Sequence, residues 1–454
     1  MNSQDMSSRG SWGSKAAFIF AASGSAIGLG NIWRFPMMVS QNGGAVFVLV
    51  YVTAVILIGF PVMLAELTIG RHAQKNPVGA FEHIKPRTPW KLTGFLGIIT
   101  GVFILSFYSV VAGWTVGYLY KTASGAFNNK DITAQLTDKI FTEFSANPFL
   151  VIVLAFIVIG LTTHIISRGV KKGIERWTKV LMPILFILII VLAVRALTLP
   201  GAEKGIAFYL RPDFSKLSGT VVLFALGQAF FSLSLGMGTM ITYGSYISKS
   251  DNLVSSAGWV SFSDTFIALL AGLIIFPTLA FAHQPFNVGS EGLVFKVFPL
   301  IFSQIPGGYF FGTFFFALLS VAAITSTISL LEVPVAYFVD EKNWSRKKAA
   351  LIIGLLSLGL AIPSALSTGG MEFFTKIKFL GALNFIFGNI ALAVGSLFIC
   401  LFVGYAWKVK KAAQEVYSGN PLFKIRPLWS FSVKYLAPVA IIFILIFIKK
   451  IVSG

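Results

Sequence analysis

The sequence is poor in the residues on which disulfide-stabilised proteins and metalloenzymes depend. Of its 454 residues only one is cysteine, Cys400, and it lies within an apolar run, so disulfides play no part in the fold. Charged residues make up 12% of the chain, which is about half the share found in soluble domains. The histidines show no metal-binding spacing, because they are scattered at His72, His83, His164 and His283. These shortages exclude an ordinary soluble domain and a histidine–cysteine metal centre.

Motifs of ATP-driven and redox enzymes are missing as well. The chain has no G-x-x-x-x-G-K-[ST] loop, the motif that binds ATP phosphates. Gly28 and Gly30 could begin a dinucleotide-binding G-x-G-x-x-G motif, but Trp33 stands at the position of its third glycine. No nucleophile–base arrangement stands out, which argues against an enzyme. The net charge is +19, but the basic residues lie in short loops between apolar segments, as in membrane proteins. We therefore expect no nucleic-acid partner.

Apolar segments are what the chain has in abundance. Hydrophobic residues make up 56% of it, and the mean hydropathy is +0.82. A segment of about 20 apolar residues is long enough to cross a bilayer as a helix. The sequence therefore predicts an all-α, polytopic transmembrane protein that forms a single domain over residues 1–454. Its eleven segments lie at 16–36, 45–70, 92–122, 149–166, 175–198, 220–247, 257–283, 307–339, 346–366, 379–406 and 430–448.

The basic residues also predict the orientation of the chain in the membrane. The loop 37–44 has no lysine or arginine, whereas the next loop carries Arg71, Lys75, Lys85, Arg87 and Lys91. By the positive-inside rule the N-terminus then lies in the cytoplasm. An odd number of segments places the C-terminus outside. The expected location is a bacterial-type inner (plasma) membrane, with the lipid bilayer as the surroundings of the chain.

The first apolar segment is interrupted at its centre. Residues 21–36 (AASGSAIGLGNIWRFP) contain Gly24, Gly28 and Gly30, followed directly by Asn31. Glycine leaves the backbone free to depart from a helix. Unpaired backbone groups cost several kcal/mol in lipid, so a broken helix survives only where it lines an enclosed cavity. The segment therefore predicts two half-helices around a small binding site.

The sixth segment repeats this pattern. Within Gly227–Tyr246 the stretch Ser232-Leu-Ser-Leu-Gly236-Met-Gly238 again places glycines beside hydroxyls. Two glycine-interrupted segments in corresponding positions indicate a transporter built of inverted repeats. The repeats would be 16–198 and 220–406, with 430–448 as an additional helix. The alternative is that these glycines only allow close helix packing, which Gly24-x-x-x-Gly28 also fits.

Oxygen-bearing side chains lie within the apolar segments. Half-helix ends and hard oxygen ligands together favour a cation and a carboxylate. A charge at membrane depth is functional by default, which singles out Asp264. Glu66 and Glu332 share this depth, with the alternative that they only bind backbone amides. The hydroxyls have the alternative of bonding to their own helix. The candidate cation ligands are Asn31, Ser232, Asp264, Thr325 and Ser326.

Several motifs resemble those of one transporter family. Residues 9–36 (RGSWGSKAAFIFAASGSAIGLGNIWRFP) are similar to the signature of the neurotransmitter:sodium symporter family. The eleven segments resemble its bacterial amino-acid transporter branch. The resemblance implies a LeuT-like fold and a sodium-coupled symporter of neutral amino acids that works by alternating access. The further matching motifs are Asn42-Gly43-Gly44, Glu66 with Gly70-Arg71, Trp114-Thr-Val-Gly117, Gly227-Gln-Ala-Phe-Phe-Ser-Leu-Ser-Leu-Gly236 and Ile324-Thr-Ser-Thr-Ile328.

The resemblance also implies which residues bind the substrate and two sodium ions. The substrate would contact Ser25, Ala26, Gly28, Gly30, Ile104, Tyr108, Phe231, Ser232, Ser234, Met237, Ser326 and Leu330. The first sodium site would comprise Ala26, Asn31, Ser232 and Asp264. The second would comprise Gly24, Ile27, Ala322, Thr325 and Ser326. The outer gate would be Arg34, Tyr108 and Phe231, and the inner gate Arg9, Trp12, Tyr246 and Asp340.

Departures from the family pattern refine these expectations. Ser25 stands where monoamine carriers have an aspartate, so we expect no monoamine substrate. Asp264 supplies a fixed negative charge, and Ala268 replaces a chloride-binding serine, so we expect transport to be independent of chloride. Asn384 lies where relatives often have an acid facing Arg34, which leaves the partner of that arginine open.

Met237 bears on the choice of substrate. Methionine is flexible and makes favourable contacts with aromatic rings. We therefore expect large hydrophobic amino acids, including aromatic ones, with the alternative that Met237 only fills a gap.

Two other functions remain possible at this point. A proton-coupled carrier of the same fold would use Asp264 or Glu66 in place of sodium. An ion channel would more naturally repeat one pore helix around an axis. The sequence leaves the oligomeric state and the number of transported ions open.

Overall fold

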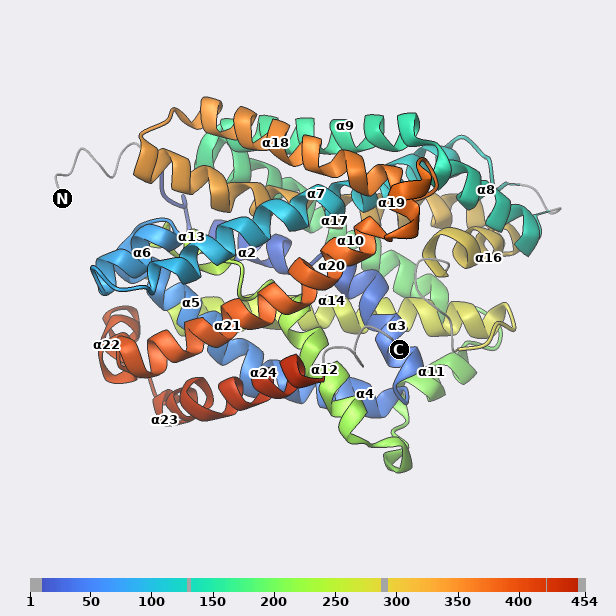
Figure 1. Ribbon diagram of the computed structural model, residues 1–454. Helices are drawn as coiled ribbons and strands as arrows, with labels where there is room; N and C mark the ends of the chain where they lie inside the picture. The colour runs from blue at the N-terminus through green and yellow to red at the C-terminus, as the bar shows by residue number, and fades with distance from the viewer. Residues whose placement is uncertain (1–9, 129–131, 287–292, 422, 448–454) are drawn as a thin grey trace.

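The chain folds into a bundle of long helices. The computed structural model describes residues 10–128, 132–286, 293–421 and 423–447, and its regular elements over these ranges are all helical. Most long helices run side by side from one end of the molecule to the other (Figure 1). The short helices α6 (Pro77–Ile84) and α22 (Val409–Gly419) lie at one end, and α8 (Ala134–Ala146) and α16 (Phe298–Gln304) lie at the opposite end.

The spanning helices follow the predicted segments. They are Lys15–Ala26 (α2) with Gly30–Arg34 (η1) and Phe35–Gln41 (α3); Ala45–Ala73 (α4, η2, α5); Lys91–Ala123 (α7); Pro148–Ser167 (α9); Val170–Leu197 (η3, α10); Gly219–Ser232 (α12) with Thr239–Gly244 (α13); Leu253–Phe281 (α14); Gly308–Lys342 (α17); Arg346–Leu366 (α18); Phe379–Ala406 (α20, η6, α21, η7); and Arg426–Ile446 (α23, η8, α24).

Length and hydropathy account for most of the eleven predicted segments. In the described ranges nine helices are long and apolar enough to cross a membrane, and the bent pair at the start of the chain makes ten. The predicted segment 220–247 is missing from this count because it is divided between α12 and α13, each too short by itself. The chain is therefore a polytopic helical membrane protein.

Both predicted helix breaks are present. The two halves of the first segment, Lys15–Ala26 and Gly30–Gln41, meet at 53°. In the sixth segment α12 ends at Ser232, and Gly236 and Gly238 have φ angles of 85° and 76°. A Cβ on Gly236 would lie 2.0 Å from the carbonyl oxygen of Leu392. Only glycine combines this left-handed backbone with so close a contact, so residues 233–238 cannot continue the helix.

Helices α7 and α17 form the centre of the bundle. The two pack along each other, and α17 also contacts α2, α9 and α10. Side chains on the periphery are apolar and exposed, among them Phe156 of α9, Ile187 of α10 and Leu355 of α18. An apolar exterior around a packed interior is the arrangement that a bilayer stabilises.

The carboxylate of Glu415 links the short helix α22 to helix α5. Glu415 lies 2.8 Å from Arg71 Nε, 3.0 Å from His72 Nδ1 and 3.1 Å from Lys249 Nζ. Burial alone would raise the pKa of Glu415. The hydrogen bond with His72 and the charges of Lys249 and Arg71 outweigh burial and lower this pKa from the usual 4.5 to about 2.

Replacing Glu415 by glutamine is expected to lower the Tm in detergent by about 3 °C. The shift in the pKa of Glu415 from 4.5 to about 2 corresponds to about 3 kcal/mol of folding stability. We reduce this value to about 2 kcal/mol because His72 and Lys249 are open to water. The folded-state pKa is depressed, so this stabilisation is present above pH 4.5 and lost as the pH falls toward 2. Glu143→Gln in α8 removes only an exposed ion pair and is the matched control. Equal Tm changes in the two variants at pH 7 would contradict the prediction.

Candidate functional site

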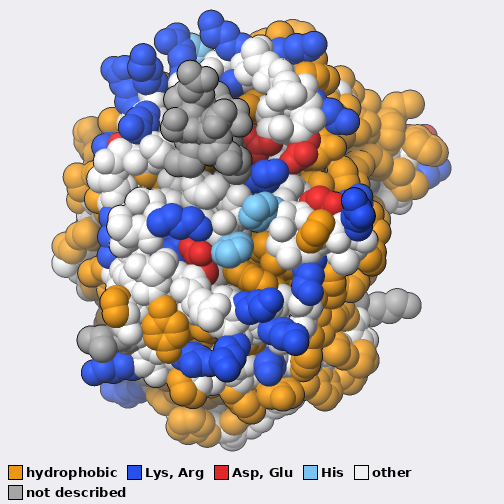
Figure 2. Space-filling model, turned by 90° about the vertical axis from the view of Figure 1, so that its left-hand side faces the viewer, with side chains coloured by type: hydrophobic (Ala, Val, Ile, Leu, Met, Phe, Trp, Pro, Cys, Tyr) orange, Lys and Arg blue, Asp and Glu red, His pale blue; other side chains and the backbone are white. Residues whose placement is uncertain are grey.

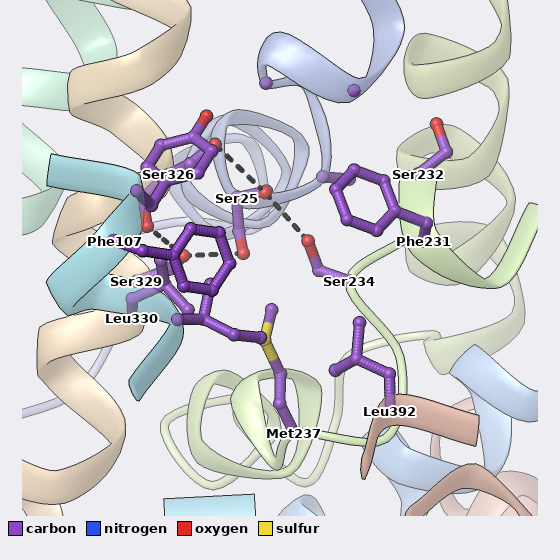
Figure 3. Close-up of a pocket in the computed structure, with 15 residues that line it drawn as sticks. Ser25, Phe107, Phe231, Ser232, Ser234, Met237, Ser326, Ser329, Leu330 and Leu392 are labelled. Carbon is purple, nitrogen blue, oxygen red and sulfur yellow. Dashed lines mark hydrogen bonds between the residues drawn. The ribbon is translucent and has the colours of Figure 1, made fainter. Parts of the chain in front are cut away.

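A small cavity lies where the two broken helices face each other. All twelve predicted substrate-contacting residues line it, from Ser25 in α2 to Leu330 in α17. The centre of a water molecule can move through about 60 Å³ within it. Figure 3 shows Met237 reaching toward its centre, between Leu330 and Leu392. The structure therefore brings residues from α2, α7, α12, α17 and the 233–238 break to one place, and their role toward a substrate remains a prediction.

One side of the cavity is polar, and its hydroxyls are already paired. Ser25 donates from its Oγ to Ser329 Oγ at 2.8 Å. Ser234 donates to the Ser25 carbonyl at 3.0 Å, and the Leu29 amide donates to the Tyr108 hydroxyl at 3.2 Å. The hydroxyls of Ser25, Ser234 and Tyr108 are therefore already hydrogen-bonded within the protein. The apolar part of the lining is formed by Ile104, Phe107, Phe231, Met237, Leu330 and Leu392.

Two glycines let the backbone of the first helix approach the cavity wall. A Cβ on Gly28 would lie 2.7 Å from Ser326 Oγ and 3.1 Å from the Tyr108 hydroxyl. A Cβ on Gly30 would lie 2.7 Å from the Phe231 ring. No side chain fits at either position without displacing a residue of the cavity.

The predicted first ion site is a buried cluster around one carboxylate. Asp264 accepts hydrogen bonds from the Asn31 amide at 2.7 Å, from Ser232 at 2.9 Å and from the Tyr51 hydroxyl at 3.4 Å. Over the described ranges no basic side chain pairs with Asp264. A buried carboxylate without a cationic partner is costly, so the oxygens of Asp264, Ser232 and Tyr51 fit a small cation. Asn31 turns its amide nitrogen toward Asp264, and its side-chain oxygen accepts a hydrogen bond from the Gly28 amide. Ala26 lines the adjoining cavity together with Ser232.

The residues of the predicted second ion site also lie together. Ser326 Oγ lies 3.2 Å from the Ala322 carbonyl and 3.5 Å from the Ile27 carbonyl. Thr325 donates to the Ala322 carbonyl at 3.0 Å, and Gly24 packs against Thr325. The hydroxyls thus bond to their own helix, the alternative noted above, while carbonyls from a second helix face them. This oxygen set also fits a small cation.

On the side of α3 and α20, Phe231 and Tyr108 separate the cavity from a larger vestibule of about 190 Å³. The Arg34 guanidinium lies 4.2 Å above the Phe231 ring and donates to Asn389 Oδ1 at 3.1 Å. Asn384 lines the same vestibule, and its carbonyl accepts a hydrogen bond from the Asn389 amide. The partner of Arg34 that the sequence left open is therefore Asn389, a neutral residue.

The opposite side of the cavity is closed by packed aromatic rings. Trp12 donates from its indole nitrogen to the Tyr243 carbonyl at 3.1 Å, and its ring packs on Phe18, Tyr243 and Tyr246. Asp340 accepts a hydrogen bond from the Asn76 amide at 2.9 Å. Arg9, the other predicted residue of this gate, lies outside the described residues.

The two further buried carboxylates differ in their partners. Glu66 accepts a hydrogen bond from the Gly236 amide at 2.8 Å. This contact confirms the alternative that Glu66 binds a backbone amide. For Glu332 that alternative is wrong, because it accepts the Tyr246 hydroxyl at 2.6 Å and forms an ion pair with Arg346. The tyrosine of the predicted inner gate is thereby linked to the start of α18.

Sequence reasoning missed several residues of the site. Phe107 and Ser329 each lie three positions after a predicted residue of the same helix, so helical spacing from Ile104 and Ser326 would have found them. Leu392 offers no such signal, because it reaches the cavity only through the packing of α21 on the 233–238 break.

Comparisons with known proteins agree with this geometry. The model of the "Sodium:neurotransmitter symporter family" matches residues 9–147 and 134–453. An uncharacterized sodium-dependent transporter of Bacillus subtilis, YhdH, is 38% identical over 447 residues, which cover 97% of this chain and 98% of that protein. The sodium-dependent serotonin transporter of Drosophila melanogaster is 28% identical and covers 97% of this chain, with 76% of its own length aligned.

A solved structure is similar over nearly the whole chain. The crystal structure of MhsT in complex with L-phenylalanine superimposes with a TM-score of 0.88 and 44% sequence identity. The match covers 96% of this chain and 99% of that one. Together these findings identify a multi-pass membrane transporter of a small molecule, rather than an enzyme, that depends on sodium. The chain belongs to the sodium:neurotransmitter symporter family.

Proposed function

We propose that this protein imports large hydrophobic L-amino acids, aromatic ones included, together with sodium by alternating access. The observation that carries the proposal is the cavity with one apolar side, beside the buried carboxylate of Asp264. The family membership supports sodium coupling. The similarity to MhsT, which was solved with L-phenylalanine, supports an aromatic substrate.

Each part of such a substrate would contact a different part of the cavity. The free ends of the broken helices near Gly28 and Gly30 would bind the α-carboxylate and α-amine, because half-helix ends carry partial charges. The apolar lining, with Met237 as its adjustable member, would enclose the side chain. Ser25 offers no carboxylate to an amine side chain, so monoamines are not substrates.

Two sodium ions would bind, one at the Asp264 cluster and one beside Thr325. Asn31, Ser232 and Ala26 would complete the first site, and Gly24, Ile27, Ala322 and Ser326 the second. A substrate carboxylate about 4 Å from sodium gains about 4 kcal/mol at an effective dielectric constant near 20. This coupling is reciprocal, so each ligand would raise the affinity for the other. Asp264 supplies a fixed negative charge, so transport would be independent of chloride.

The proposed topology is that of the bacterial members of the family. Two inverted repeats, 16–198 and 220–406, would rock around the site, with 430–448 as the additional helix. The protein would lie in the inner (plasma) membrane with its N-terminus in the cytoplasm and its C-terminus outside.

Uptake into liposomes tests this function. Radiolabelled tryptophan and leucine should enter when an inward sodium gradient is imposed, and not with potassium or proton gradients. Replacing chloride by gluconate should leave the rate unchanged. Tyrosine should compete, and glycine and serotonin should not. Uptake driven by protons alone would support the alternative of a proton-coupled carrier, and substrate-independent current would support a channel.

Changing the neutral outer gate to an acid is expected to slow turnover. In Asn389→Asp the new carboxylate would face the Arg34 guanidinium at about the present distance of 3.1 Å. A partly buried ion pair would stabilise the closed gate by about 1 kcal/mol, which corresponds to about fivefold lower kcat. The measurement is the initial rate of uptake at saturating substrate.

The control for this variant is Asn147→Asp at the start of α9, which adds the same charge at a residue that does not line the vestibule. The exposed Asn147 side chain accepts a hydrogen bond from the Leu150 amide, which an aspartate can also accept, so the rate should change less than twofold. Slowing that is equal in both variants would show that an added charge acts without a defined partner.

A further inference from the structure

A strip of basic side chains lies between the last two spanning helices. We define the basic strip as Lys408, Lys410, Lys411, Lys424 and Arg426, of which the four lysines are exposed. Glu415 is the sole acid in the sequence 407–426. Its carboxylate is bound by Arg71, His72 and Lys249, away from the strip. The charge of the strip is therefore uncompensated within its own segment.

The fold of this segment turns the strip outward. Lys408 has a φ angle of 71°, and this left-handed residue separates α22 from the preceding helix. The opposite face of α22 is buried through Val409, Ala412, Ala413 and Val416. With that face fixed on the bundle, Lys410 and Lys411 point away from it. Figure 2 shows lysine and arginine side chains gathered around the rim of this end of the molecule.

Apolar and aromatic side chains continue from the strip along the spanning helices. Tyr405, Leu428, Phe431 and Tyr435 are each about half exposed, with fractions from 49% to 55%. They belong to η7, α23 and η8, the ends of the spanning helices that α22 connects. Tyrosine is enriched at the boundary between hydrocarbon and headgroups. The strip therefore lies at headgroup level, with a surface for acyl chains directly below it.

The opposite end of the molecule differs in its charges. There several acids pair with lysines, among them Asp138 with Lys296 at 2.5 Å and Glu372 with Lys376 at 2.8 Å. Such pairs offset part of the basic charge at that end. In the described part of the chain, by contrast, no ion pair involves a residue of the basic strip.

From these observations we infer that the basic strip binds the headgroups of anionic phospholipids in the leaflet at the α22 end. Each basic residue near a membrane surface contributes about 1 kcal/mol, or about fivefold in affinity, toward anionic lipid. The aromatic side chains beneath the strip favour an intact lipid over a free phosphate, because only the lipid also covers the apolar surface. This inference is independent of the transported substrate.

Native mass spectrometry of the purified full-length protein tests this inference. The probes are phosphatidylglycerol and phosphatidylcholine of the same chain length, with glycerol phosphate as the headgroup alone. The test variant carries Lys408→Gln, Lys410→Gln, Lys411→Gln and Lys424→Gln. The control variant loses the same charge at the opposite end, through Lys139→Gln, Lys204→Gln, Lys216→Gln and Lys376→Gln.

The wild-type protein should retain phosphatidylglycerol in preference to phosphatidylcholine. The test variant should bind phosphatidylglycerol at least tenfold more weakly, and the control variant less than twofold more weakly. Raising the salt concentration should weaken binding to the wild type and not to the test variant. Equal losses in the two variants, no preference for the anionic lipid, or equal binding of glycerol phosphate would each overturn the inference. Because lipid binding is measured without transport, its failure would leave the proposed function untouched.

Discussion

Replacing Asp264 by alanine should lower sodium-driven amino-acid uptake at least 100-fold while leaving the protein folded. The carboxylate is fully buried and joins Asn31, Ser232 and Tyr51 from three other elements. Removing it takes away the negative charge that would hold the first sodium ion. The attraction between two opposite charges about 4 Å apart is about 4 kcal/mol at an effective dielectric constant near 20, which is close to 1,000-fold in affinity.

Two further variants separate the charge of Asp264 from its packing. Asp264→Asn keeps most hydrogen bonds and removes the charge, so its sodium dependence should shift to at least tenfold higher concentrations. Ser261→Ala lies one turn earlier on α14, where the hydroxyl contacts only the Met63 sulfur at 3.6 Å, and should transport normally. If Asp264→Ala kept wild-type rates with unchanged sodium dependence, the coupling site would lie elsewhere.

Replacing Gly28 by alanine is expected to reduce uptake at least 30-fold. The new methyl group would lie 2.7 Å from Ser326 Oγ and 3.1 Å from the Tyr108 hydroxyl. One of these side chains must then move. Both line the cavity, and Ser326 also belongs to the predicted second ion site. A cost of about 2 kcal/mol is typical of overpacking in a dense interior, and here it falls on the binding site. The readouts are the uptake rate and the binding affinity for tryptophan.

The control for this glycine is Gly258→Ala on α14. No atom lies within 4 Å of the position that its Cβ would take, so uptake and thermal stability should stay as in the wild type. Normal tryptophan affinity in Gly28→Ala would mean that the substrate does not depend on the close approach of this backbone.

The features that sequence reasoning predicted share one physical origin. A glycine-rich break or a carboxylate in lipid is so costly that it requires a protein-enclosed site. This cost made the breaks near Gly28 and Gly236 and the position of Asp264 visible in the sequence alone. The prediction of the surrounding lining followed from the family resemblance, and the structure brings those residues to one cavity.

The features that the sequence left open depend on local helix geometry and on turns. Asn384 and Asn389 are five positions apart, a spacing at which ordinary α-helical counting places them on different faces. The π-helical turn η6 (Ile386–Ala391) brings them together, so that Asn389 bonds back to Asn384 and also meets Arg34. The Glu332–Arg346 pair depends in turn on how residues 343–345 connect α17 to α18.

The pairing of Arg34 with a neutral residue, Asn389, has a consequence for a carrier that works over a range of salt concentrations. A gate closed by two opposite charges at the water boundary weakens as dissolved ions screen it, with a screening length that falls from about 10 Å at 0.1 M to about 3 Å at 1 M. Here closure rests on an amide dipole and an aromatic ring. With the proposed orientation, in which the vestibule lined by Arg34 faces outward, the external sodium concentration can therefore rise without loosening this closure.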